Sequence, residues 1–303
     1  MHTRAPEPLP FDAVLVAGPT ASGKSAAALR LAEEIGGAVV NADSMQIYRE
    51  LSTLSARPSP EEVARVPHHL FGHVGVREAY SVGRYVQEAA QTLARVRAEG
   101  RLPIFCGGTG LYFAALTEGI AEIPTVPQEV RAAVRKRREQ LGPAAFHAEL
   151  VRQDPASARL NPGDRQRTLR AMEVLEASGQ PLSFWQQRPA PAVLGGLRLK
   201  RVVLAPPRME LYARIDARFV RMMEEGALAE ARALEDLDPG LPAAKALGLR
   251  PLQDYLAGRC TLPSAVARAQ MATRNYAKRQ LTWFRHRMVD WLWVTDGNII
   301  ITN

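Results

Sequence analysis

The sequence predicts an α/β protein in which helices flank a parallel sheet and an all-helical domain is inserted into the sheet domain. Two observations support the sheet: apolar runs at 13–17 and 102–106 are each followed by a glycine-rich turn and a helical pattern. A third supports the insertion, because helical periodicity without strand-like runs fills 121–194. We therefore expect a core formed by residues 1–120 and 195–303, interrupted by the helical insertion.

The remaining elements follow from apolar periodicity, caps and breakers. Ser81 is placed to cap a helix over 82–99, which Gly100 ends. Proline and glycine separate the helices of the insertion, and a Pro-Ala-Pro tract follows them. Further helices are expected at 127–141, 143–152, 164–178, 209–225, 227–236 and 263–288. Strands are expected at 38–40, 201–205 and within 291–303.

The composition is that of a globular protein, with 47% hydrophobic and 23% charged residues. Apolar runs are too short for a membrane span, and the first ten residues lack the apolar core of a signal peptide. Cys106 and Cys260 are far apart, which suggests neither a disulfide framework nor a zinc module. We therefore expect a cytoplasmic protein with no membrane partner.

Charge is distributed unevenly along the chain. Residues 1–120 carry a net charge of −1 and residues 121–303 a net charge of +9, which together give the +8 of the whole chain. A near-neutral first part joined to a basic second part suggests an anionic macromolecule bound mainly by the second. A solvated arginine-rich surface explains the charge equally well, so charge alone does not decide.

The first glycine-rich turn fits the phosphate-binding pattern G-x-x-x-x-G-K-[ST]. It reads Gly18-Pro19-Thr20-Ala21-Ser22-Gly23-Lys24-Ser25. Backbone N–H groups, the start of the following helix and the charge of Lys24 all favour a bound polyphosphate. Ser25 is placed to ligate Mg²⁺. The turn therefore predicts a P-loop NTPase-like sheet, with Mg²⁺ as cofactor.

Two polar residues follow other predicted strands. Asp43 comes after the strand at 38–40, and Thr109 after the strand at 102–106. Open parallel sheets bind ligands at the carboxyl ends of their strands. We therefore expect Asp43 and Thr109 to face the site of Lys24.

Three histidines, His68, His69 and His73, include a pair at the i, i+4 spacing of helical metal ligands. No HExxH pattern or cysteine accompanies them, and Gly72 and Gly75 argue against a helix there. We interpret them as packing or hydrogen-bonding residues.

The last long helix has a basic face with aromatic neighbours. Arg274, Lys278, Thr282 and Arg285 recur at three- and four-residue steps, with Trp283 beside them. Cations interleaved with aromatics suit an RNA backbone and unstacked bases. A solvated basic helix over an aromatic contact is the alternative interpretation.

The residues alone leave several functions open. A kinase or NTPase would use the loop for a nucleoside triphosphate and Asp43 on Mg²⁺. A transferase would instead hold a diphosphate leaving group, and a carboxylate at Asp43 would accept a proton from the incoming nucleophile. A non-catalytic RNA-binding protein needs the basic helix but not Lys24 with Asp43.

Five stretches taken together resemble the tRNA dimethylallyltransferases. They are the loop Gly18–Ser25, Asp43-Ser-Met-Gln46, Gly107-Gly-Thr-Gly-Leu-Tyr112, Asp164-Arg-Gln-Arg167 with Arg170, and Lys278-Arg-Gln-Leu-Thr-Trp283 with Arg285. The resemblance runs from about residue 11 to 295. It implies transfer of a dimethylallyl group from dimethylallyl diphosphate to N6 of adenosine 37 in tRNAs that read codons beginning with U. An adenylate prenyltransferase acting on free nucleotide and a small-molecule kinase are the alternatives.

The resemblance also implies roles for individual residues. Asp43 matches the general base, and Thr109 matches a hydroxyl near the bridging oxygen or beside the aspartate. The diphosphate-binding residues would be Gly18, Thr20, Ala21, Ser22, Gly23, Lys24 and Ser25. The residues that contact the tRNA anticodon stem-loop would be Asp43, Ser44, Met45, Gln46, Thr109, Arg131, Gln166, Arg167, Arg170, Lys278, Arg279, Gln280 and Arg285. We expect the enzyme to act as a monomer.

Two stretches depart from the family pattern. The usual Gly-Thr-Ala-Lys-Pro is Leu54-Ser-Ala-Arg-Pro58, which loses a glycine, and the usual Gly-Tyr-Arg is Gly248-Leu-Arg250, which loses an aromatic ring. Neither departure touches Lys24, Asp43 or Thr109.

Overall fold

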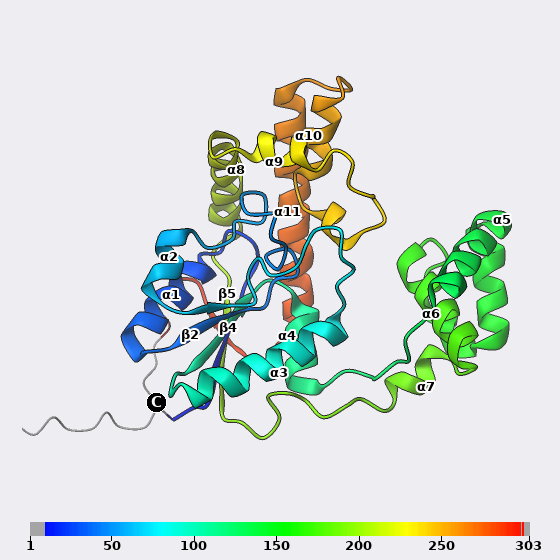
Figure 1. Cartoon of the computed structure of the whole chain (residues 1–303), viewed down its shortest axis with the longest axis horizontal. Coiled ribbons are helices and arrows are strands. Elements are labelled where there is room, and N and C mark those ends of the chain that lie inside the picture. Colours follow the sequence, from blue (N-terminus) through cyan, green and yellow to red (C-terminus); the bar gives the residue numbers. More distant parts are fainter. Residues whose placement is uncertain (1–9, 298, 300–303) are drawn as a thin grey trace, which may run out of the picture. The chain divides into compact units, whose positions relative to one another are not determined.

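The computed structural model describes residues 10–297 and residue 299. The described part of the chain divides into two compact units. One joins the described residues of Met1–Ala114 and Gly196–Asn303 and is called the core unit, and the other, Ala115–Gly195, is called the helical unit. Figure 1 shows the sheet in the core unit and only helices and loops in the helical unit.

The core unit is built on a parallel sheet with the strand order β3-β2-β4-β1-β5-β6 in the described residues. Its strands are β1 (Ala13–Ala17), β2 (Ala38–Asn41), β3 (His68–His69), β4 (Pro103–Gly107), β5 (Leu199–Leu204) and β6 (Leu292–Val294). Every pairing is parallel, with Val14 of β1 opposite Ile104 of β4 and Lys200 of β5. The predicted fold class is confirmed. The two-residue strand β3 is the element of the sheet that the sequence did not indicate.

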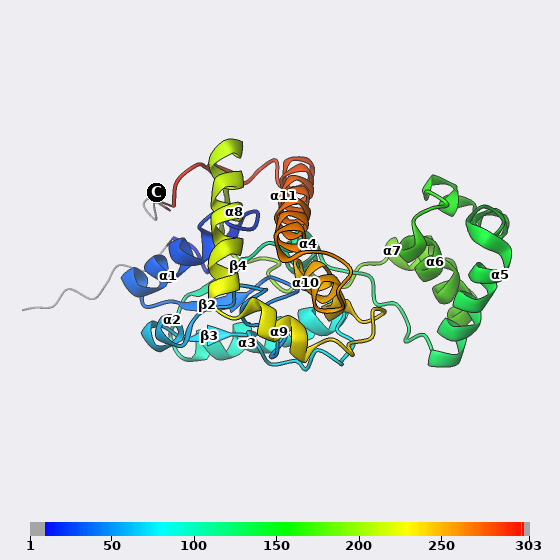
Figure 2. The ribbon, with the colours of Figure 1, turned by 90° about the horizontal axis from the view of Figure 1, so that it is seen from above.

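Helices cover both faces of the sheet. The helices are α1 (Lys24–Ile35), α2 (Pro60–Arg65), α3 (Val82–Ala98), α4 (Gly110–Glu118), α5 (Gln128–Gln153), α6 (Arg165–Ser178), α7 (Leu182–Gln186), α8 (Arg208–Glu224), α9 (Ala227–Ala233), α10 (Leu249–Leu256) and α11 (Leu262–Arg287), with short 3₁₀ turns at Pro155–Arg159 and Pro242–Lys245. Val14 and Val16 pack with α1, and alternation along the strand directs Leu15 to the opposite face. Figure 2 shows α1 and α3 on opposite sides of the strands.

Most helix boundaries follow from local chemistry. Ser81 accepts a hydrogen bond from the backbone N–H of Arg84 and begins α3 as predicted. Gly142, with φ of 76°, interrupts α5, so the two helices expected around Pro143 join at a kink. The structure also contains α2, α7 and α10, which the sequence pattern did not indicate.

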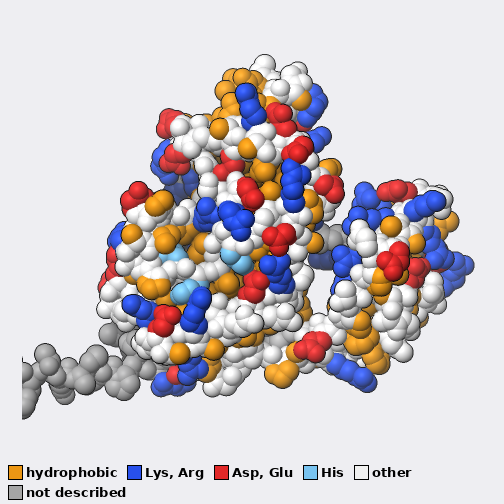
Figure 3. Space-filling view, in the orientation of Figure 1, with side chains coloured by type: hydrophobic (Ala, Val, Ile, Leu, Met, Phe, Trp, Pro, Cys, Tyr) orange, Lys and Arg blue, Asp and Glu red, His pale blue; other side chains and the backbone are white. Residues whose placement is uncertain are grey.

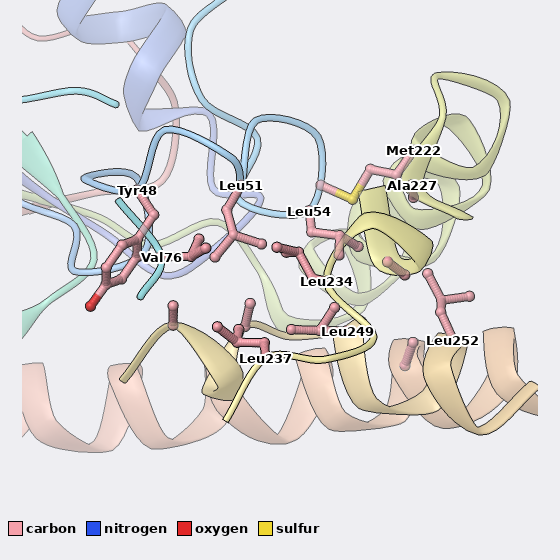
Figure 4. Close-up of a cluster of buried hydrophobic side chains, with 14 of the residues drawn as sticks. Tyr48, Leu51, Leu54, Val76, Met222, Ala227, Leu234, Leu237, Leu249 and Leu252 are labelled. Carbon is pink, nitrogen blue, oxygen red and sulfur yellow. The ribbon is translucent and has the colours of Figure 1, made fainter. Parts of the chain in front are cut away.

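A second apolar cluster joins the loop after β2 to the helices α8, α9, α10 and α11 (Figure 4). Leu54 and Leu249, the two departures from the family pattern, both belong to it. A Cβ on Gly248 would lie 3.2 Å from Leu54 and 2.7 Å from Phe219, so this glycine permits the close packing. The leucine gained at 54 therefore fills space in the same cluster from which an aromatic ring is missing at 249.

No helix in the described part of the chain is both long and apolar enough to cross a membrane.

Candidate active site

The glycine-rich turn lies at the carboxyl end of the central strand, β1. Gly23 is the N-cap of α1 with φ of 93°, a conformation that favours glycine, and Lys24 begins the helix. Lys24 is only 8% exposed, and its Nζ donates to the carbonyl of Pro19 over 3.3 Å. Burial lowers the pKa of Lys24, and the nearby Asp43 carboxylate opposes this shift. The loop thus holds a cation ready to meet an anionic ligand.

A large cavity of about 1180 Å³ lies over this loop. Gly23, Lys24 and Ser25 line it from the loop. A cationic wall of the cavity is formed by Arg57 from the loop after β2 and by Arg214, Arg218 and Arg221 from α8, and two carboxylates, Glu62 and Glu225, also line the cavity. Figure 3 shows Lys and Arg side chains beside histidine side chains on one face of the core unit. The cavity has the charge that a polyphosphate requires.

The sequence interpretation missed the three arginines of α8. They recur at i, i+4 and i+7, so they share one face of the helix. Arg214 donates to the carbonyl of Ser22 over 3.2 Å, which fastens this face to the loop. Burial lowers the pKa of Arg218, and Asp43 opposes the shift. The periodicity was visible in the sequence, but only the fold places it opposite the loop.

Asp43 and Thr109 lie together at the carboxyl ends of β2 and β4. Asp43 Oδ1 accepts the N–H of Met45 over 2.9 Å, and the Asp43 N–H donates to the Asn41 side chain over 2.8 Å. Thr109 Oγ1 accepts the N–H of Ser44 over 2.9 Å and donates to the Ser44 hydroxyl over 3.2 Å. Thr109 therefore holds the residue after the aspartate, and Asp43 Oδ2 is left for other partners.

Gln280 of α11 connects the two glycine turns. Its Oε1 accepts the N–H of Thr20 over 3.0 Å, and its Nε2 donates to the carbonyl of Gly108 over 2.8 Å. A Cβ on Gly108 would lie 2.4 Å from this Nε2 and 3.2 Å from Asp43 Oδ2, so only glycine fits between them. Gln280 is 6% exposed. In this structure both ends of its amide are bonded inside the core unit, and its expected contact with RNA stays a prediction.

The other loop residues occupy distinct positions. Gly18 lies so close to β5 that a Cβ would be 2.7 Å from the carbonyl of Leu204. The Thr20 N–H donates its hydrogen bond to Gln280, so in this structure it is not available to donate to a phosphate. Ala21 lines the cavity and has a φ of 63°. Ser22 is buried, with 2% of its surface exposed, and its hydroxyl has no hydrogen-bond partner in the described residues.

A narrower pocket of about 50 Å³ adjoins the cavity and contains Asp43. The two spaces share Ala21, Arg218 and Met222. The wall of the narrow pocket is mainly apolar and includes Met45, Leu54, Ile215, Phe219, Met222 and Leu247. An apolar group bonded to a phosphate chain in the cavity therefore has a place beside the carboxylate.

Residues 44–46 divide between the site and its support. Met45 lines the narrow pocket and packs against the second apolar cluster. Gln46 is 9% exposed, and its Nε2 donates to the carbonyls of Ser55 and Ala56 over 3.0 and 2.8 Å. The amide Nε2 of Gln46 therefore holds the neighbouring loop, and the expectation that Gln46 lines the flipped base stays a prediction.

The basic residues of α11 lie on its exposed side. Lys278, Arg279 and Arg285 are exposed, and the Arg279 guanidinium lies 5.6 Å from the ring centre of Tyr276. Arg274 instead pairs with Asp216 over 2.5 Å. A single helix thus presents these cations to solvent and inserts Gln280 between the glycine turns.

The expected tRNA contacts of the helical unit cluster around the start of α6. Gln166 and Arg167 are exposed on its first turn, whereas Arg170 is partly buried one turn later. Arg131 of α5 lies near Arg170 and Glu173. Burial raises the pKa of Glu173, and Arg131 and Arg170 oppose the shift.

The histidines lie outside a helix, as expected. His68 and His69 are in β3, and His69 Nδ1 lies 2.8 Å from an Arg95 guanidinium nitrogen. His73 Nε2 lies 2.7 Å from Glu88 Oε2. These contacts agree with a hydrogen-bonding role.

Glu88 of α3 gathers three donors. Its carboxylate accepts hydrogen bonds from Tyr80, Arg84 and His73, over 2.6, 2.8 and 2.7 Å. Burial alone raises the pKa of Glu88, but these hydrogen bonds outweigh it, so the pKa lies below its ordinary value. The charged form of Glu88 therefore stabilises the fold beside the site.

The fold and the loop together define a P-loop protein of the parallel α/β class. Comparison with known families then assigns the particular group. The model of the IPP transferase family matches residues 46–287, and the isopentenyl transferase model matches residues 11–71. The chain belongs to the IPP transferase family.

Its relatives are named tRNA dimethylallyltransferases. The chain is 53% identical to that of Bradyrhizobium sp. (strain ORS 278), with 93% of each chain covered. It is 55% identical to that of Parvibaculum lavamentivorans, with 92% of this chain and 89% of the relative covered. The family resemblance seen in the sequence is confirmed.

Solved structures agree. The tRNA isopentenylpyrophosphate transferase of Bacillus halodurans is 33% identical, with a TM-score of 0.66, and the match covers 94% of this chain and 89% of that one. A eukaryotic dimethylallyltransferase described as acting on tRNA is 25% identical, with a TM-score of 0.77 over 90% of this chain and 69% of that one.

Proposed function

We propose that this protein transfers the dimethylallyl group of dimethylallyl diphosphate to N6 of adenosine 37 in tRNAs that read codons beginning with U. One observation carries the proposal: a cationic cavity over the P-loop adjoins a narrow apolar pocket that contains Asp43. In this proposal the diphosphate occupies the cavity and the five-carbon chain enters the apolar pocket, so that the carbon between them would lie next to the carboxylate. If the protein were a kinase, its nucleoside triphosphate would have no apolar chain to occupy this pocket.

The cations act on the leaving group. Lys24, Arg218 and the loop N–H groups stabilise the negative charge that develops as the carbon–oxygen bond breaks. These groups are held before the reaction starts, because Lys24 is buried in the loop and Arg214 fastens α8 to it. The loop therefore needs little reorganisation during transfer.

Asp43 serves as the general base. Its Oδ1 is fixed by the N–H of Met45, so Oδ2 is available to accept the proton that N6 loses as its bond to carbon forms. The products are N6-(dimethylallyl)adenosine and diphosphate. Thr109 positions this carboxylate through Ser44. Adenosine 37 must leave the anticodon-loop stack to reach Asp43.

Mg²⁺ fits the site as a companion of the diphosphate. Ser25 lines the cavity next to Lys24, and Mg²⁺ in such sites takes few protein oxygens and completes its shell with phosphate and water. When bound, the ion would supply charge stabilisation to the departing diphosphate. Ser25 would hold the ion. The proton that N6 loses is accepted by Asp43.

The tRNA contacts come from both units. Lys278, Arg279 and Arg285 present cations from α11, and Gln166 and Arg167 present polar and cationic groups from α6. We place the anticodon stem-loop against these residues and against Arg131 of α5 and Arg170 of α6. The protein acts on tRNA in the cytoplasm as a monomer.

A labelled prenyl donor tests the proposal. The protein is incubated with labelled dimethylallyl diphosphate, Mg²⁺ and either unmodified tRNA or AMP. Label at adenosine 37 of the tRNA and none in AMP is expected. Label in AMP alone would instead favour the adenylate prenyltransferase.

A further inference from the structure

A separate cavity of about 280 Å³ lies within the helical unit, and the proposed chemistry does not use it. Its lining residues come from the end of α5, the following 3₁₀ turn, α6 and α7. Leu160 and Leu182 supply apolar surface, and Asp154, Gln166 and Arg170 supply polar groups. The volume lies just below the range of sites for drug-sized ligands, so it limits the occupant to a small group.

The polar groups of this cavity offer both an acceptor and a donor. Asp154 is 3% exposed and is held by the hydroxyls of Ser157 and Ser183 over 2.7 and 3.2 Å. Because each carboxylate oxygen can accept more than one hydrogen bond, Asp154 retains acceptor capacity.

Arg170 supplies the donor. Of the three arginines that line the cavity, Arg159 lies 3.4 Å from Gln186 and Arg167 pairs with Asp164 over 3.5 Å. Within the described residues the Arg170 guanidinium forms no hydrogen bond, although it is partly buried. A partly buried cation without hydrogen bonds favours a ligand that supplies an acceptor or a flat π-face.

We propose that this cavity receives an unstacked nucleobase of the tRNA anticodon loop, distinct from adenosine 37. The inference rests on the proposed function, since tRNA is the ligand. The leucines cover the faces of the base, Arg170 and Asp154 meet its edge, and the exposed Arg167 at the rim faces the adjoining backbone. Unstacked loop bases are the usual targets of RNA-binding proteins, and a mix of apolar walls with edge donors and acceptors matches their chemistry.

Anticodon stem-loops with one abasic nucleotide test this assignment. Each loop position other than 37 is replaced in turn, and binding is measured by fluorescence anisotropy. With the unaltered protein, one abasic RNA is expected to bind about tenfold more weakly than the intact loop. With Arg170→Met this difference shrinks to within about twofold, because the base no longer has its partner.

Two more variants complete the design. Ala156→Leu adds bulk to the cavity wall without removing a polar group, and it should abolish the same difference. Arg152→Met removes an exposed cation of α5 that does not line the cavity, and it should preserve the difference.

Two results would overturn the assignment. In the first, the abasic penalties stay the same in Arg170→Met and Ala156→Leu as in the unaltered protein. In the second, Arg170→Met weakens every RNA equally and lowers the salt dependence, which indicates a phosphate contact instead. Prenyl transfer to the intact loop is measured in parallel, so a failure of the proposed function is seen separately.

Discussion

Gln280→Leu tests whether α11 fixes the positions of the two glycine turns relative to each other. The leucine removes both hydrogen bonds of the amide and leaves the buried Gly108 carbonyl and the half-buried Thr20 N–H without partners. Each unsatisfied group costs about 1–3 kcal/mol, so the variant is expected to lose about 2–6 kcal/mol of the free energy of unfolding. That is a large part of the roughly 5–15 kcal/mol available to a folded domain.

Turnover should fall as well, because one turn belongs to the proposed diphosphate site and the other adjoins the proposed general base. Thr20 belongs to the diphosphate loop, and Gly108 adjoins Asp43 Oδ2. A displacement of about 1 Å between them is expected to lower turnover by about 10²-fold. The assays are urea unfolding and prenyl transfer at saturating tRNA and donor, at a temperature where the variant is fully folded.

A matched control isolates the role of the Gln280 amide. Asn275→Leu makes the same kind of change on the exposed side of α11 and should leave stability and turnover near the unaltered values. An unfolding midpoint and turnover in Gln280→Leu equal to those of Asn275→Leu would refute the reasoning.

The other predictions concern the base, the leaving group, RNA binding and pH. Asp43→Ala should lower turnover by about 10²- to 10⁴-fold and leave tRNA affinity largely intact; near-normal activity would remove Asp43 from the role of base. Arg218→Met should slow transfer at saturating donor, and a change confined to KM would show that Arg218 serves binding only. Replacing Lys278 and Arg285 with alanine should weaken tRNA binding and flatten its salt dependence by about 0.7 for each phosphate that is no longer neutralised; an unchanged slope would place the RNA elsewhere. Because the folded-state pKa of Glu88 lies below its ordinary value of 4.5, its stabilisation is present above that pH and is lost as the pH falls through the folded-state pKa. Glu88→Gln should therefore narrow the stability difference between pH 7 and pH 4 in urea unfolding, and an unchanged difference would contradict this.

The glycine-rich loop and the strand ends were readable from the sequence. A phosphate loop depends on local order, since an apolar strand, two glycines and a Lys-Ser pair specify it within a dozen residues. The meeting of Asp43 and Thr109 was also predictable, because parallel strands end at one edge of a sheet. The cap of α3 at Ser81 is equally local.

Tertiary structure decided which polar side chains bond inside the protein. Gln280 stands in a basic stretch that predicts an RNA contact, yet the packing of α11 turns it between the two glycine turns. The donors of Gln46 are likewise used by a loop ten residues away. No sequence pattern reveals such hydrogen bonds, because each depends on how the chain folds back on itself.

The cationic wall and the apolar pocket depend on long-range packing in the same way. Arg214, Arg218 and Arg221 follow the loop by nearly two hundred residues, and only the return of the chain through β5 and α8 brings them opposite Lys24. By itself the sequence predicted a phosphate-binding loop at the end of β1 and a carboxylate that faces it. The tertiary structure alone decided what else surrounds them, since a cavity is made by surfaces that meet only after folding.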